Sequence, residues 1–267
     1  MRTVEFIGGK LSAPSNTCPR YDAAMKTGFL LFSLLGMSGP VWADTLTFAV
    51  STGSAMPMTQ FHGEMLSSGL LKDFGDALAL ELKLEPRYLN LPRKRVEAAL
   101  LDGQADLLCD LRPEWLDRKG WLWTGTVFSN NMIVVSRIDT ATLPALSGLS
   151  GQRVGTLLGY RYPEMEQALG RSFARDDAAS DDLNTSKLLG KRFNYMVSNS
   201  LYFDYQRMVH PQSAQLNPAV LTVRSFDTFC ALPPRGKLQL DRVNRAIIAL
   251  RQRGTMRAIY ERYRPSR

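Results

Sequence analysis

The stretch RVEAALLDGQADLLC, residues 95–109, indicates the fold class of this chain. Its first part places Val96, Ala99 and Leu100 at the spacing of one helix face, and Gly103 favours the end of that helix. The apolar run that closes the stretch predicts a compact strand. A helix that leads directly into a buried strand is the repeating unit of sheets with helices on their faces.

The residues before this stretch continue the alternation. The apolar run Leu46–Val50 predicts a strand that is followed by a turn-rich loop. We expect a helix next, ended by Pro86, and then a second strand at Pro86–Leu89. The buried face of the helix is predicted from apolar side chains at spacings of three and four: Leu71, Phe74, Leu78 and Leu82. This β-α-β-α-β order is typical of a parallel sheet, in which ligands bind at the carboxyl ends of the strands.

The residues after the stretch contain a second series of the same kind. It begins with the extended segment Val127–Ser136 and restarts after Gly151 with a strand at Arg153–Thr156 and a tight turn at Leu158–Arg161. The other elements expected in this series are helices at residues 163–169, 181–189 and 201–207 and strands at residues 194–197 and 221–223.

The final segment is expected to return to the first series. It combines a strand at Thr228–Leu232 with a long helix that has Val243, Ala246, Ile247 and Leu250 on one face. Because nothing after this helix can build a third sheet, we expect an α/β fold of two lobes joined by two crossings, with a hinge and an interlobe cleft. Lobe I comprises residues 44–128 plus 226–267, and lobe II comprises residues 129–225.

Residues 25–43 have the pattern of a cleavable secretory signal peptide. Met25 and Lys26 open a charged region, an apolar run of about ten residues follows, and Ala43 is a small residue at the expected cut. The alternative, a buried N-terminal element, would not carry that ending. The run is too short to span a bilayer, and no cysteine follows it directly, so we expect neither a membrane anchor nor a lipoprotein. Residues 1–24 are interpreted as a mis-assigned start, and the product is expected in the periplasm.

Charge and motif content argue against several classes of function. The formal net charge is +8, but the basic residues are spread along the chain without a dense block that interleaves aromatic residues, so nucleic acid is not an expected partner. The two histidines, His62 and His210, stand beside no Ser or Cys nucleophile motif, and no metal-ligand spacing occurs. We therefore expect no catalytic residue, no metal and no cofactor.

Four stretches carry a resemblance to a known family: Gly69–Leu84, Arg95–Leu108, Gly151–Gly159 and Asn244–Tyr263. In this order and spacing the chain resembles the bacterial extracellular solute-binding proteins of family 3, the amino-acid-type periplasmic receptors of ABC transporters. The resemblance implies a Venus-flytrap fold of type II, in which a small polar solute, an amino acid or a related compound, bridges two lobes and favours hinge closure. It also implies a monomer that delivers its solute to an ABC permease.

The charged residues that hold an α-amino acid in this family do not carry over to this chain. Trp115 stands where the family places the Arg that binds the ligand carboxylate. Ser198, Asn199 and Ser200 occupy the region in which family members often place an Asp that takes the ligand ammonium, and none of the three is a carboxylate. Arg112 is a candidate substitute as an anion clamp, paired with Asp110, although a solvated loop arginine is the alternative. We expect Trp115 to wall the cleft, and Phe61 in the first loop is a weaker candidate.

The main candidate site is the turn in lobe II formed by Gly159, Tyr160, Arg161 and Tyr162. This turn precedes the helix that begins at Pro163, and free backbone N–H groups at a helix N-terminus favour an anion. The two tyrosines would flank a ligand; packing within the lobe is the alternative role.

The resemblance also implies that Cys109 and Cys230 lie side by side near the hinge. In an oxidising periplasm we expect them to form a disulfide, and two buried thiols are the alternative. Two other functions stay open: a cyclohexadienyl-type dehydratase on the same fold, and a receptor that reports its ligand to a membrane partner.

Overall fold

The computed structural model describes residues 44–263, all of which belong to one compact unit. The expected signal peptide at 25–43 and the expected mis-assigned start at 1–24 lie outside the described residues. Within the described part of the chain, no helix is long and apolar enough to cross a membrane.

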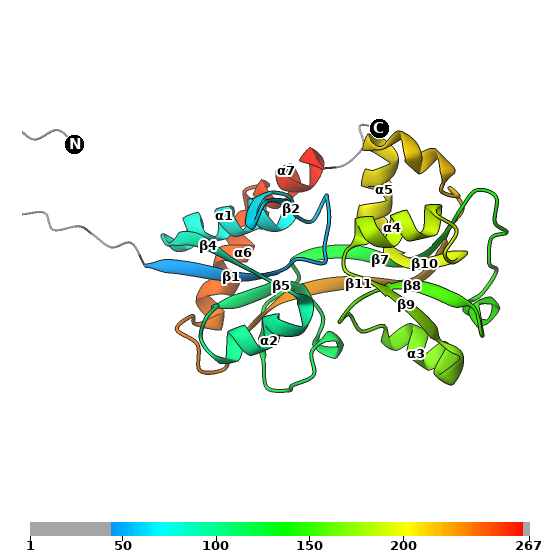
Figure 1. Ribbon diagram of the computed structural model, residues 1–267. Coiled ribbons are helices and arrows are strands. Elements are labelled where there is room, and N and C mark those ends of the chain that lie inside the picture. The colour runs from blue at the N-terminus through cyan, green and yellow to red at the C-terminus, as the bar shows by residue number, and fades with distance from the viewer. Residues whose placement is uncertain (1–43, 264–267) are drawn as a thin grey trace, which may run out of the picture. The chain divides into compact units, whose positions relative to one another are not determined.

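Among residues 44–263, nine strands form one sheet in the order β4-β1-β5-β11-β7-β10-β8-β9, with β6 paired to β11 (Figure 1). A separate hairpin, β2–β3, follows the first strand. The strand bounds are β1 Thr45–Ser51, β2 Gln60–His62, β3 Met65–Ser68, β4 Glu85–Leu91, β5 Leu107–Leu111, β6 Leu122–Trp123, β7 Phe128–Ser136, β8 Arg153–Leu157, β9 Ala174–Ala178, β10 Tyr195–Asn199 and β11 Leu221–Leu232.

The sheet has two halves, each with a parallel core. In the first half, β1 pairs in parallel with β4 and β5; in the second, β8 pairs in parallel with β9 and β10. Strand β11 belongs to both halves, because it pairs antiparallel with β7 over Leu221–Thr228 and with β5 over Phe229–Ala231. The chain thus crosses between the halves twice, once between β6 and β7 and once within β11.

The expectation of two separate strands at 221–223 and 228–232 was wrong, since β11 is continuous. The residues between them, Arg224–Asp227, pair with β7, and all but Phe226 are polar and exposed, so this segment lacks the apolar pattern from which a strand is predicted.

Helices cover both faces of the sheet (Figure 1). In the first half α2 lies on one face and α1, α6 and α7 on the other, and in the second half α3 lies opposite α4 and α5. The helix bounds are α1 Leu70–Leu82, α2 Arg93–Leu101, α3 Pro163–Leu169, α4 Asp181–Leu189, α5 Ser200–Val209, α6 Leu240–Gln252 and α7 Thr255–Arg262.

Helix α1 ends before Pro86, contrary to the expectation that this proline stops it. Lys83 takes a left-handed backbone conformation (φ 56°), and its N–H donates to the Ala79 and Leu80 carbonyls. A left-handed residue of this kind is a common helix end. Pro86 instead lies in β4, at the edge of the sheet, where a missing N–H is tolerated.

Phe74 offers a sharp test of the first half's core. It is fully buried in α1 and packs edge-on against Phe128 of β7, with ring centroids 5.6 Å apart. We expect Phe74→Ala to lower the free energy of unfolding by about 3–5 kcal/mol, because it leaves a cavity in addition to the lost burial. Leu80→Ala is the matched control, since Leu80 is on the same helix and 79% exposed, and it should change stability by less than about 0.5 kcal/mol. Urea denaturation measures both; equal effects would contradict the assigned core.

Candidate functional site

The carboxyl ends of parallel strands from both halves of the sheet surround a cavity of about 120 Å³. Ser51 ends β1, Asp110 lies near the end of β5, and Leu157 and Ser198 lie at the ends of β8 and β10; all four line the cavity. This is the position at which α/β sheets bind ligands.

Asp110 is one of two carboxyl groups that line the cavity, and it is partly buried. It adopts a left-handed conformation (φ 60°) within β5, which Asp tolerates better than most residues. Burial raises the pKa of Asp110 to about 6, and a hydrogen bond with the Thr228 side chain acts in the opposite direction. Asp110 was a predicted site residue, and the structure brings it to the cavity.

Asp181, at the start of α4, is the second carboxyl group, and sequence reasoning missed it. The pKa of Asp181 is raised to about 7, mainly by burial and also by the negative charges of Asp182 and Asp110. A hydrogen bond from the Ala55 backbone N–H acts in the opposite direction. An acidic residue in the first turn of a helix usually faces solvent, where it interacts favourably with the positive end of the helix dipole. The position of Asp181 in the sequence therefore gave no reason to predict that it is buried.

The arginines around the cavity are already partnered. Arg161 lines it, and its Nη1 lies 2.7 Å from Oδ1 of Asp117. Arg112, which is 6% exposed, lies outside the lining and forms ion pairs with Glu114 and, at 3.1 Å, with Glu164.

Arg93, a lining residue that was not predicted, is also held in place. Its guanidinium lies 5.7 Å from the centre of the Tyr160 ring and donates a 2.9 Å hydrogen bond to the Trp115 carbonyl. Burial lowers the pKa of Arg93, and the charges of Tyr160, Glu97 and Asp117 oppose that shift.

Tyr160 connects the second half of the sheet to the loop after β1. Its hydroxyl lies 3.2 Å from Ser54 Oγ and donates to Ser51 Oγ, also at 3.2 Å. The turn that carries it depends on Gly159, whose φ is +81° and where a Cβ atom would lie 2.9 Å from the Lys94 side chain. Gly159 itself is not part of the cavity lining.

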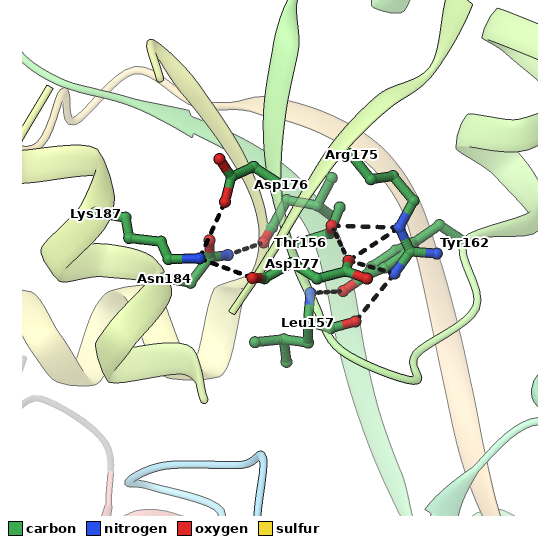
Figure 2. A network of polar contacts seen from close by, with 9 residues as sticks. Thr156, Leu157, Tyr162, Arg175, Asp176, Asp177, Asn184 and Lys187 are labelled. Atoms are coloured by element: carbon green, nitrogen blue, oxygen red, sulfur yellow. Dashed lines mark hydrogen bonds and ion pairs between the residues drawn. The ribbon is translucent and has the colours of Figure 1, made fainter. Parts of the chain in front are cut away.

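Tyr162 lines the cavity but uses its hydroxyl to support the strand ends (Figure 2). That hydroxyl accepts a 2.9 Å hydrogen bond from the Leu157 N–H, and the Arg175 guanidinium covers the ring at 5.1 Å. Arg175 also donates to the Leu157 carbonyl and to Asp177, while Lys187 donates to the Asp177 carbonyl. This network holds the ends of β8 and β9 in position.

The expected anion site at the start of α3 gains no support from its surroundings. The first turn of α3 carries Glu164 and Glu166, and the nearby Leu157 N–H already donates to Tyr162. Two acidic side chains at this position oppose an anion.

The remaining predicted residues divide between the cavity and the core. Asn199 lines the cavity and caps α5, because its Oδ1 accepts from the Tyr202 N–H at 2.9 Å. Trp115 also lines the cavity, and its ring packs edge-on against Phe226. Phe61 lies in the β2–β3 hairpin, packs on the first half's core and is absent from the lining.

Further lining residues were not among the predicted site residues, although Ser198 lies beside Asn199 in the region compared with the family's Asp. Ser51, Ser54, Ser198 and Phe226 are small or apolar residues that only the meeting of the two halves brings together. Among the described residues, no group of three or more His, Cys, Asp or Glu side chains could hold a metal ion.

Cys109 of β5 and Cys230 of β11 form a disulfide, with the two sulfur atoms 1.98 Å apart. The bond joins two neighbouring strands at the point where β11 passes from one half of the sheet to the other. Cys109 also lines the cavity, next to Asp110.

Comparison with known proteins identifies the fold. No protein-family model matches the sequence, and no curated protein does. The ancestral amino acid-binding protein AncCDT-1, a precursor of cyclohexadienyl dehydratase, is similar with a TM-score of 0.70 at 16% identity, covering 83% of this chain and 96% of that one.

Two further solved structures have the same fold. A substrate-binding protein of an ABC uptake transporter from Streptococcus pneumoniae, with bound histidine, has a TM-score of 0.70 at 15% identity and covers 82% of this chain and 92% of its own. The GluR0 ligand-binding core from Nostoc punctiforme, in complex with L-glutamate, has a TM-score of 0.66 at 15% identity and covers 82% of this chain and 98% of its own. The chain therefore has the two-lobed α/β fold of periplasmic amino-acid-binding proteins, and the fold class predicted from the sequence is confirmed.

Proposed function

We propose that this chain is a periplasmic solute-binding protein that captures a small polar solute between its two lobes and delivers it to an ABC permease. The observation that carries this proposal is the cavity, because charged and polar side chains from both halves of the sheet line it. The likeness to structures with bound histidine and L-glutamate supports a small solute as the ligand.

Closure of the lobes is part of the proposal, with lobe I at residues 44–128 plus 226–267 and lobe II at 129–225. Several polar contacts join these two parts at the rim of the cavity. The Asp181 N–H donates to the Gly53 carbonyl at 3.1 Å, and the ion pairs Arg112–Glu164 and Arg161–Asp117 also join the two parts. A solute that touches both parts binds the closed state better and so increases its population.

Two kinds of membrane partner are considered for the solute-bound protein. An ABC permease is the proposed partner, and a membrane receptor that reads the closed form is the alternative. Uptake of the identified solute by cells that lack this protein decides between them: loss of uptake supports the permease, while unchanged uptake supports the receptor.

A dehydratase is the competing function, and one observation favours it. Asp181 is a buried carboxyl group with a pKa of about 7, the range suited to a general acid. Turnover of an aromatic carboxylic acid by the purified protein would replace the proposed function with this one.

The proposal is tested by a thermal-shift screen of amino acids, opines, polyamines and organic acids. A ligand present at one hundred times its Kd adds about 2.7 kcal/mol of stability, which corresponds to a rise in Tm of about 5–10 °C for a chain of this size. Tryptophan fluorescence provides a second readout, since Trp115 lines the cavity. If the protein is folded by circular dichroism and no compound in any class binds, the proposed function is wrong.

A further inference from the structure

We propose that the ligand is a small organic cation without a carboxylate of its own, a protonated amine or an amidinium, held between the carboxylates of Asp110 and Asp181. This inference rests on the proposed function, because it names the class of solute that the same cavity takes. It departs from α-amino acids, whose carboxylate needs a cationic partner.

Among the described residues, the two carboxyl groups lack a cationic partner. Among residues 44–263, neither Asp110 nor Asp181 forms an ion pair. Their hydrogen bonds come from the Thr228 side chain and the Ala55 backbone N–H, both uncharged groups. Asp181 is only 7% exposed, and a buried carboxylate is costly unless it is paired. A ligand cation that touches both groups would supply that pairing.

The cations at the cavity are, by contrast, already engaged. Arg161 pairs with Asp117, Arg112 pairs with Glu164, and Arg93 donates to the Trp115 carbonyl and covers Tyr160. No arginine of the described lining is left with its full set of donors for a ligand carboxylate.

Two helix N-termini near the cavity, those of α4 and α5, are capped by side chains. Ser180 accepts from the Leu183 N–H at α4, and Asn199 accepts from the Tyr202 N–H at α5. These caps use backbone donors that an anion would need.

An unpartnered hydroxyl inside the cavity points independently to a ligand. Ser198 is 8% exposed and lines the cavity, and its Oγ has no hydrogen-bond partner among the described residues. A buried polar atom without a partner is unfavourable, and a polar group of the ligand would satisfy it.

Aromatic rings form part of the cavity wall. Trp115, Tyr160 and Phe226 line it, and each ring already lies near an arginine, Arg112 for Trp115 and Phe226 and Arg93 for Tyr160. These rings therefore offer apolar surface to the carbon chain of the ligand, and the cationic group of the ligand is left to the two carboxylates. In the described part of the chain the indole N–H of Trp115 also has no hydrogen-bond partner, so a hydroxyl or carbonyl oxygen on the ligand would complete the site. The expected ligand therefore combines a cationic group with a neutral polar group.

The volume limits the size of this ligand. The cavity of about 120 Å³ is somewhat smaller than an apolar cavity of about 150 Å³ that binds benzene. A linear amine with about five to eight non-hydrogen atoms is therefore the right size for a probe.

The experiment compares five four-carbon compounds of matched length by isothermal titration calorimetry at pH 8, where both carboxyl groups are ionised. The compounds are 4-aminobutan-1-ol, 1,4-diaminobutane, 4-aminobutanoate, butanoate and 1,4-butanediol. We expect 4-aminobutan-1-ol and 1,4-diaminobutane to bind and 4-aminobutanoate to bind at least about tenfold more weakly, because its carboxylate is repelled by the two acids. Butanoate and 1,4-butanediol should not bind.

Variants connect the binding to the two carboxyl groups. Asp181→Asn keeps the shape and an acceptor for the Ala55 N–H, and we expect it to weaken 4-aminobutan-1-ol by about 10- to 100-fold. Asp110→Asn should also weaken binding, because it removes the second carboxylate. Asn tolerates the left-handed conformation found at this position, so this variant should keep the backbone of β5. Asp102→Asn is the matched control, since it removes the same charge at the exposed C-terminal end of α2, away from the cavity, and should leave affinity unchanged. Circular dichroism verifies that each variant is folded.

The outcomes separate this inference from the proposed function. Equal binding of 4-aminobutanoate and 4-aminobutan-1-ol, or full affinity in folded Asp181→Asn, would overturn the cation inference. Binding of an amino acid or organic acid but of none of the cations would also overturn it and would leave the proposed function standing. Binding of no solute in any class would instead reject the proposed function.

Discussion

Removal of the Cys109–Cys230 disulfide by the paired substitution Cys109→Ala and Cys230→Ala is expected to lower the free energy of unfolding by about 3–5 kcal/mol. The bond closes a loop with a sequence separation of 121 residues, and a cross-link over a loop of this length strongly restricts the unfolded chain. Alanine avoids placing a hydroxyl at position 230, which is fully buried. Urea denaturation followed by circular dichroism gives the difference from the oxidised wild type.

Two controls isolate the bond from the side chains. The wild type unfolded in the presence of a reducing agent should lose a similar amount of stability, and the alanine pair should be insensitive to that agent. A loss below about 1 kcal/mol in both experiments would show that the bond does not stabilise this fold.

The second large effect is a pH dependence of cation binding. We expect the affinity for 4-aminobutan-1-ol to rise with pH by about 1,000-fold between pH 5 and pH 8. The pKa of Asp181 is raised to about 7 and that of Asp110 to about 6, so both groups are mostly neutral at pH 5 and must lose protons to pair with the ammonium. A primary ammonium itself stays charged over this range. Titration calorimetry at four pH values measures the trend.

Proton release provides an independent check. Near pH 6, binding of the cation should release a proton to the buffer, so the observed enthalpy should depend on the ionisation enthalpy of the buffer. Asp181→Asn should reduce this dependence, and Asp102→Asn should retain it. An affinity that stays constant from pH 5 to pH 8 would contradict the role of the two acids.

The same pKa shift has the opposite effect on the stability of the ligand-free protein. The folded-state pKa of Asp181 lies above its ordinary value of 3.8, so the folded protein binds more protons than the unfolded chain between about pH 4 and pH 7. Its contribution to stability is therefore present at low pH and is lost as the pH rises through that window. Asp181→Asn should accordingly be at least as stable as the wild type at pH 8, which distinguishes weaker binding from unfolding.

Local patterns in the sequence were sufficient for most helices and central strands. Helices α3 and α4 have the bounds expected from the sequence, 163–169 and 181–189, because a proline or a capping residue starts each one and apolar spacing continues it. Strand β9 was missed. Its sequence is ARDDA, and the charges of Asp176 and Asp177 are satisfied by Lys187, Arg192 and Arg175, contacts that no local pattern reveals.

The candidate site was predictable mainly where it follows the ends of strands, and Trp115 is an exception, since it lies in the turn at residues 113–115. Asp110, Tyr160 and Asn199 reach the cavity because the residues at the carboxyl ends of parallel strands meet there. Arg112 and Phe61 are predicted residues that do not line the cavity. Arg112 lies two residues beyond Asp110 but forms an ion pair with Glu164 of the other half of the sheet, and Phe61, in the β2–β3 hairpin, packs on the core.

The stretch at residues 95–109 and its counterparts along the chain determined the α/β class and the order of elements, since apolar spacing and turn residues act over a few neighbouring positions. Only the tertiary structure decided which charges are paired. Asp181 packs against the loop at Gly53 and Ala55, which is far from it in sequence. The nearby arginines form ion pairs with other carboxylates, Arg112 with Glu164 and Arg161 with Asp117. The proposed cationic ligand follows from this difference between paired arginines and unpaired aspartates, because a buried charge is stable only beside a charge of opposite sign.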